Sequence, residues 1–187
     1  MGSMYRSSVV FVLLLLAMFV TITPSHAAPS CDVSSYPALQ GRDLSGCDLS
    51  ALDLHGANLR GANLSGTTMI QTLLYGANLN GANLNGAMLG GVDLLGAQLR
   101  GATIIGVDMT AAELKRADFT GADLSNSDLH DSNLYAATLS RATLTHTNLD
   151  YTLTTRVKTF GTLWSDTTCP DHTNSDQNGG TCAGHLT

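Results

Sequence analysis

Histidine is the side chain that most often moves protons at neutral pH, so the histidines are the first candidates for chemistry. Five of the six follow the N-terminal thirty residues: His55, His130, His146, His172 and His185. None of them belongs to a recognisable nucleophile or zinc-binding signature. Serine and threonine are abundant, but they fall at repeating positions that turns and strand ladders use. The sequence therefore predicts a protein that is not an enzyme and has no cofactor.

Clusters of carboxylates and amides are the second possible source of chemistry, because calcium prefers oxygen ligands. Asp108, Asp128 and Asn148 recur at intervals of 20 residues, and Asp131 and Asp150 lie near them. Columns of this kind also arise where Asp and Asn only bond to turns and water, and that interpretation is favoured. No metal site is predicted, and calcium at this column stays an alternative.

The C-terminal segment 174–179, with the sequence NSDQNG, partly fits the pattern D-x-[DN]-x-[DN]-G of a calcium-binding loop. Asn174 stands where that pattern has Asp. The twelfth position is His185 and not the Glu that binds calcium through both oxygens. A polar loop closed by a disulfide is the simpler interpretation, which leaves calcium at this loop as a second alternative.

The chain has four cysteines: Cys31, Cys47, Cys169 and Cys182. An even number of cysteines in an exported chain suggests disulfides, and four cysteines allow three pairings. Two of them lie near each end of the chain. Pairing within each end, Cys31 with Cys47 and Cys169 with Cys182, is therefore favoured.

The N-terminal residues have the three parts of a secretory signal peptide. Arg6 precedes the apolar run 9–20, and the small residues that follow predict cleavage after Ala27. The alternative is a permanent membrane anchor, but spanning a bilayer takes about 20 apolar residues and this run is shorter. We therefore expect a secreted or periplasmic protein without stable membrane insertion. Loss of Arg6 changes the net charge from −6 to −7, which argues against a nucleic-acid partner.

Residues 41–150 set the architecture, because they divide without a gap into 22 units of five residues. The fourth position is always apolar: 18 units have Leu there, and the others have Met69, Met109, Ile104 or Phe119. The second position is small in 20 units, and only Arg42 and Leu52 depart from this. The third is Asp or Asn in 14 units, and Gly opens 13. A helix repeats near 3.6 residues and a strand near 2, so this pattern predicts extended segments joined by turns that stack into a solenoid.

This sequence strongly resembles the pentapeptide-repeat family, whose motif is A(D/N)LXX. The resemblance implies an all-β fold, a right-handed quadrilateral β-helix in which four units form one coil. It also implies that the second and fourth positions point inward. The repeat then makes about 5.5–6 coils. The expected organisation is a signal peptide (1–27), an N-terminal cap (28–40), the β-solenoid (41–165) and a disulfide-closed C-terminal tail (166–187), with Phe160 and Trp164 helping to cover the second end.

Residues 20 positions apart should lie one above another, which makes the outer surface predictable. We number the faces by their units: the second face starts at 46, 66 and 86, and the third at 51, 71 and 91. Five outward apolar residues should gather where these two faces meet, and we call them the apolar corner: Ile70, Leu73, Tyr75, Met88 and Leu95. Exposed apolar clusters often mark contact surfaces. The more common alternative is a stacked ladder that only stiffens the sheet.

The predicted function is a non-enzymatic exported scaffold that binds a protein or an envelope glycan on a flat face. Some members of the family resemble duplex DNA and bind type II topoisomerase, so a DNA mimic is one alternative. Residues 41–150 contain eleven acidic and six basic residues, and the basic ones dilute the negative charge that mimicry of DNA requires. A self-assembling structural protein, such as a homodimer joined through the apolar corner, is the other alternative.

Overall fold

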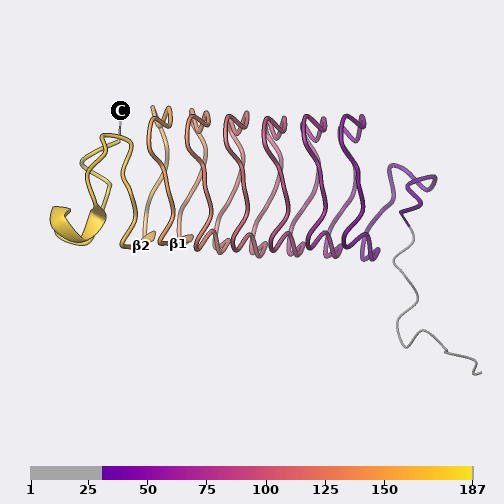
Figure 1. The fold of residues 1–187 in the computed structure, drawn as a ribbon, viewed down its shortest axis with the longest axis horizontal. Coiled ribbons are helices and arrows are strands. Elements are labelled where there is room, and N and C mark those ends of the chain that lie inside the picture. The colour runs from indigo at the N-terminus through magenta and orange to yellow at the C-terminus, as the bar shows by residue number, and fades with distance from the viewer. Residues whose placement is uncertain (1–30, 187) are drawn as a thin grey trace, which may run out of the picture.

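The structure is a computed structural model, and it describes residues 31–186. The predicted signal peptide lies outside the described residues. The chain forms a rod of stacked coils that ends in a C-terminal tail (Figure 1). The regular elements within 31–186 are β1 (Thr143–Thr145), β2 (Leu163–Ser165) and the 3₁₀ helix η1 (Ser175–Asn178). The other coils pair through isolated parallel bridges, so the fold is all-β.

Each five-residue unit turns at its first position, where the backbone is left-handed. The φ angle is +63° at Gly56 and +65° at Gly96. A non-glycine residue is strained in this conformation by roughly 1–2 kcal/mol, which explains why Gly opens so many units. The N–H of the second residue then donates to the carbonyl of the previous fourth residue, as Ala57 does to Leu54 at 3.1 Å.

The coils pair in a register of 20 residues, so four units separate each residue from its neighbour in the next coil. The bridges run from Ala38↔Asn58 to Asn148↔Thr168. Pairing therefore extends one unit beyond each limit expected for the solenoid. In the last unit, Cys169 occupies the inward position that Leu fills elsewhere, and it is fully buried.

The inward columns form one continuous hydrophobic core. The fourth-position residues of the repeat are at most 2% exposed, and Phe119 is the largest of them. Full burial of each such side chain contributes about 1.5–3 kcal/mol, and this column supplies most of the driving force for stacking. The two departures from the small second position stay near the surface. Leu52 packs against the core, while Arg42 donates to the carbonyl of Asp32 at 3.0 Å.

Several second positions carry a hydroxyl that ties one coil to the one before it. Thr72 donates to the carbonyl of Leu49 at 2.8 Å, and Thr147 donates to that of Leu124 at 2.9 Å. Both donors are buried, so these bonds satisfy groups that water does not reach. Ser132 is a buried hydroxyl for which the described residues provide no partner.

Both ends of the rod are closed by the favoured disulfides, Cys31–Cys47 and Cys169–Cys182. At the C-terminal end the tail turns back and adds an antiparallel bridge, Thr168↔Asn174. Trp164 is partly buried against the core. The expectation that Phe160 covers this end is wrong, because its side chain is 78% exposed. Phe160 occupies the fifth position of its unit, which lies at an outward corner.

None of the helical turns within residues 31–186 has the length and apolar character needed to cross a bilayer.

Candidate binding surface

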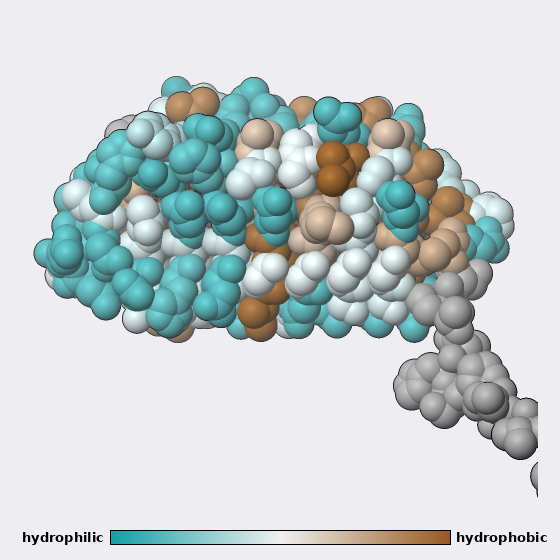
Figure 2. Space-filling model, in the orientation of Figure 1, coloured by the Kyte–Doolittle hydropathy of each residue, from teal (hydrophilic) through white to brown (hydrophobic). Residues whose placement is uncertain are grey.

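All five residues of the apolar corner point outward. Their exposed fractions lie between 38% for Tyr75 and 47% for Met88. On the face drawn in Figure 2, hydrophobic residues interrupt the surface in the N-terminal half of the rod, whereas the C-terminal end is mostly hydrophilic. The repeat itself cannot require these side chains, because the outward positions have no access to the core.

The backbone pairing places the apolar corner on two adjacent faces in successive coils. Leu73 bridges Asp53 below it and Asp93 above it on the third face. Leu95 lies one coil above Tyr75, since the N–H of Gly76 donates to the Leu95 carbonyl at 2.9 Å. Met88 pairs with Thr68 on the second face, one coil above the unit that ends in Ile70. Ile70 therefore lies at the turn between the two faces, with Met88 and Leu73 on either side of it. Tyr75 and Leu95, which occupy fifth positions, lie at the turn that ends the third face, so the five residues spread across that face and do not gather at one corner.

An aromatic column runs along the end of the third face. The rings of His55 and Tyr75 are stacked, with centroids 4.9 Å apart and an interplanar angle of 11°. Tyr36 donates its hydroxyl to the carbonyl of His55, and Asp53 pairs with the His55 ring at 2.7 Å. Stacked rings cover each other's faces, so Tyr75 has less free ring surface for a ligand than its exposure suggests. Stacking of outward rings, the ladder alternative, is therefore present in this column.

The outward Asp and Asn residues stabilise their own turns. An Asp or Asn at the third position accepts the N–H of the residue two positions later, as Asp48 does from Ser50 at 3.0 Å and Asn133 from Tyr135 at 3.1 Å. These are Asx turns, which explains the preference for Asp and Asn at the third position. Hydrogen bonds from Ser50 lower the pKa of Asp48 below its ordinary value. The outward acidic side chains thus stabilise the turns of the solenoid.

The acidic column does not converge on a common point. Asn148 Nδ2 donates to Asp128 Oδ1 at 3.0 Å, and the same oxygen accepts the N–H of His130 at 3.0 Å. The neighbouring carboxylates are also engaged: Asp108 with Thr110, Asp131 with His130 and Asp150 with His172. Nowhere between residues 31 and 186 do three Asp, Glu, His or Cys side chains gather as metal ligands.

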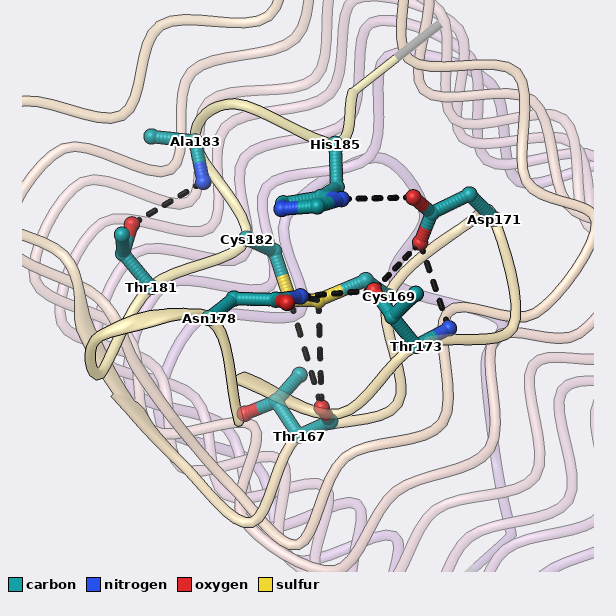
Figure 3. Close-up of polar contacts among 9 residues, drawn as sticks. All are labelled: Thr167, Cys169, Asp171, Thr173, Asn178, Thr181, Cys182, Ala183 and His185. Atoms are coloured by element: carbon teal, nitrogen blue, oxygen red, sulfur yellow. Dashed lines mark hydrogen bonds and ion pairs between the residues drawn. A yellow bond between two sulfur atoms is a disulfide. The ribbon is translucent and has the colours of Figure 1, made fainter. Parts of the chain in front are cut away.

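The tail loop is held by bonds among its own residues (Figure 3). Asp171 accepts the Thr173 hydroxyl at 2.6 Å and pairs with the His185 ring at 2.6 Å. Hydrogen bonds from Thr173 and His185 lower the pKa of Asp171 to about 2. Asn178 Nδ2 donates to the Thr173 hydroxyl at 2.6 Å. His185, at the twelfth position of the partial calcium pattern, is therefore bound to the cap itself.

Asn174, the first residue of that partial pattern, begins η1 as its N-terminal cap. Its Oδ1 accepts the N–H of Asp176 at 2.9 Å, and its Nδ2 donates to Asp166 Oδ1 at 2.8 Å. Asp176 Oδ1 accepts the N–H of Asp166 at 2.9 Å. These bonds attach the tail to the end of the last coil.

A second group of outward apolar residues lies in the last coil: Tyr151, Leu153, Phe160 and Leu163, which are 58%, 58%, 78% and 63% exposed. We did not predict them as a surface. The signal was nevertheless present, since Leu153 and Leu163 stand at third positions, as Leu73 does. The same stacking rule places Leu153 on the third face, four coils beyond Leu73.

No pocket opens on the surface formed by residues 31–186. The geometry therefore defines a class of protein, a rod-shaped all-β solenoid of five-residue units with turn-stabilising polar ladders outside. The sequence model of pentapeptide repeats matches eight copies over residues 43–81, 77–115 and 112–150. The chain belongs to the pentapeptide repeat family.

Solved structures with the same kind of repeat are similar to this chain. HetL, involved in heterocyst differentiation regulation in the cyanobacterium Nostoc sp. strain PCC 7120, is 31% identical over 73% of this chain and 74% of HetL, with a TM-score of 0.42. A trypsin-treated form of QnrB1, a plasmid-mediated fluoroquinolone resistance protein, is 18% identical over 69% of this chain and 63% of its own, with a TM-score of 0.58. A pentapeptide repeat protein of the Arabidopsis thaliana thylakoid lumen is 27% identical over 71% of this chain and 72% of its own, with a TM-score of 0.31. No curated protein matches the sequence significantly.

Proposed function

We propose that this chain is an exported, non-enzymatic scaffold that binds a protein or glycan partner of the cell envelope through the apolar corner. One observation carries the proposal: five large apolar side chains stay 38–47% exposed in the second and third coils of the repeat, where outward positions are mostly polar. Full burial of such a side chain contributes about 1.5–3 kcal/mol, so a partner that covers the exposed 38–47% would recover roughly 1 kcal/mol from each.

Two features support a location outside the cytoplasm. The predicted signal peptide would direct export, and the two disulfides suit an oxidising compartment. A secreted or periplasmic rod would meet its partner there. We take the rod to be a right-handed quadrilateral β-helix of about 5.5–6 repeat coils, with residues 28–40 and 166–187 protecting its ends.

A binding role fits the described chemistry better than catalysis. Each of the five histidines in the described part pairs with an Asp carboxylate, and the serine and threonine hydroxyls mostly bond to turns or neighbouring coils. An Asp-paired imidazole is also the base of a catalytic triad, but none of the described bonds joins one of these rings to a serine or threonine hydroxyl. The DNA-mimic alternative has no comparable support, because the outward carboxylates are engaged in Asx turns and basic residues are interspersed among them.

The test is capture of partners from an envelope extract by the immobilised, disulfide-bonded chain. Two double variants remove one side of the corner each: Ile70→Ser with Met88→Ser on the second face, and Leu73→Ser with Leu95→Ser on the third. The matched control is Phe160→Ser with Leu163→Ser, which removes two apolar residues that are more exposed, at 78% and 63%, but lie in the last coil. We expect at least a tenfold loss of the captured protein or glycan in a corner variant and none in the control. Equal capture by all three variants would refute the proposal.

A further inference from the structure

We propose that the third face is the interface of an antiparallel homodimer, in which a second copy of the chain packs with its two-fold axis beside Glu113. The inference rests on the proposed function only in treating exposed apolar residues as contact residues. It goes beyond it, because a dimer on the third face covers Leu73 and Leu95 and so narrows the surface left for an envelope partner to Ile70 and Met88 on the second face.

The third positions of this face form a column whose two leucines lie at equal distances on either side of Glu113. Consecutive bridges join its members in the order Asp53, Leu73, Asp93, Glu113, Asn133 and Leu153. Leu73 is 39% exposed and Leu153 is 58% exposed, and each stands two coils from Glu113. Interfaces with two-fold symmetry must be self-complementary. An axis along the strand direction at Glu113 reverses the column and sets Leu73 against the partner's Leu153.

The other positions of the face match under the same operation. Asp93 comes opposite the partner's Asn133, whose amide nitrogen is a suitable donor for the carboxylate. At the fifth positions, Leu95 comes opposite the partner's Tyr135. Glu113 lies on the axis and is already paired with Lys115 of its own chain at 3.1 Å. The negative charge of Glu113 at the centre of the interface is therefore neutralised by Lys115 of the same copy.

Charge decides between the two possible orientations of the dimer. A parallel dimer, with its axis along the rod, would set each acidic residue of the column against its own copy, namely Asp53, Asp93 and Glu113. Like charges directly opposite each other are destabilising. The antiparallel arrangement keeps only the Glu113 apposition and replaces the Asp93 one with an amide–carboxylate contact. Both arrangements contain two leucine–leucine contacts, so the apolar contact is equal and the charges decide.

The dimensions of the face predict a weak dimer. Four coils separate Leu73 from Leu153, which at about 4.8 Å per coil is roughly 19 Å. A five-residue unit spans about 16 Å, so the footprint is well below the roughly 800 Å² per partner of a standard interface. Dissociation in the micromolar range is expected, and the association must be followed over concentration.

Sedimentation velocity of the disulfide-bonded chain from about 5 to 500 μM tests the proposal. We expect Leu73→Lys and Leu153→Glu each to weaken dimerisation at least tenfold. Combining both substitutions should restore it, because the antiparallel dimer then places opposite charges against each other at both contacts. Leu163→Lys, on the first face, is the matched control and should leave the dimer unchanged.

A strict monomer at the highest concentration would overturn the inference, as would a dimer that Leu153→Glu leaves intact. A dimer that both single changes weaken, but that the combined change does not restore, would exclude the antiparallel arrangement. The outcomes stay separate from those of the proposed function. A monomer that still captures an envelope partner through Ile70 and Met88 removes this inference alone, whereas a rescued dimer that captures nothing removes the proposed function alone.

Discussion

Two serines in adjacent units should respond in opposite directions when each is replaced by alanine. Ser127 and Ser132 both occupy the small second position, and both are at most 2% exposed. Ser127 Oγ donates to the carbonyl of Ile104 at 2.5 Å and accepts the N–H of Val107 at 3.1 Å. Ser132 Oγ has no partner among the described residues.

The expected changes in the free energy of unfolding depend on which polar groups lose a partner when each hydroxyl is removed. Ser127→Ala removes the acceptor of the buried Val107 N–H, and an unsatisfied buried group costs about 1–3 kcal/mol. Ser132→Ala removes a buried hydroxyl that has lost its water and gained no bond, so the folded state should become about 1 kcal/mol more stable. The small position accepts alanine readily, since 12 of the 22 repeat units have it.

Urea unfolding with both disulfides intact measures the two changes, as a shift of the midpoint at constant slope. A constant slope is required because stacked repeats do not always unfold in one step. The reasoning is refuted if Ser132→Ala destabilises the chain as much as Ser127→Ala. That result would mean that the Ser132 hydroxyl donates in solution to the carbonyl of Met109, as Thr72 does to that of Leu49.

Two further predictions concern the core and the tail. Phe119→Ala should lower the free energy of unfolding by about 3–5 kcal/mol, because Phe119 is fully buried, whereas Phe160→Ala should change it by less than about 0.5 kcal/mol. Thermal unfolding of the two variants checks this, and equal losses would contradict the placement of Phe160 outside the core. The pKa of Asp171 is about 2 in the folded chain, below its ordinary value of 3.8, so its contribution to stability is present above that value and is lost as the pH falls towards 2. Protection of the amides of residues 169–185 against hydrogen exchange, taken relative to their intrinsic exchange rates, should fall over this interval, and Asp171→Asn should remove this pH dependence of the protection.

The repeat made much of the fold predictable, because one rule acts on every unit. The inward fourth positions, the exposure of the five outward apolar residues and the two disulfides all followed from position and spacing. The same rule applied beyond residue 150 would have identified Leu153 as outward on the third face. It would also have placed Phe160 at a corner. The five-residue register continues to Cys169, and the assignment of Phe160 to the cap ignored it.

Other features depend on distances that the sequence pattern does not contain. Ser127 and Ser132 look equivalent in the repeat, and only side-chain geometry separates the bonded hydroxyl from the unbonded one. The tail has no repeat, so its antiparallel return at Asn174 was not predictable. The pairing of Asp171 with His185 depends on how the closed loop folds back.

The register of 20 residues also limits how this protein can change its length. Inserting or deleting one five-residue unit would keep every leucine in the core, yet it would rotate everything beyond that point by a quarter turn. A unit deleted near Glu113 would move Leu153 from the third face to its neighbour and separate it from Leu73, while the solenoid stayed folded. Four units added or removed together would restore the face and alter only the spacing along the rod. The core therefore tolerates insertion or deletion of a single unit, but the alignment of residues along one face does not. That alignment is kept only when the chain gains or loses whole coils of four units.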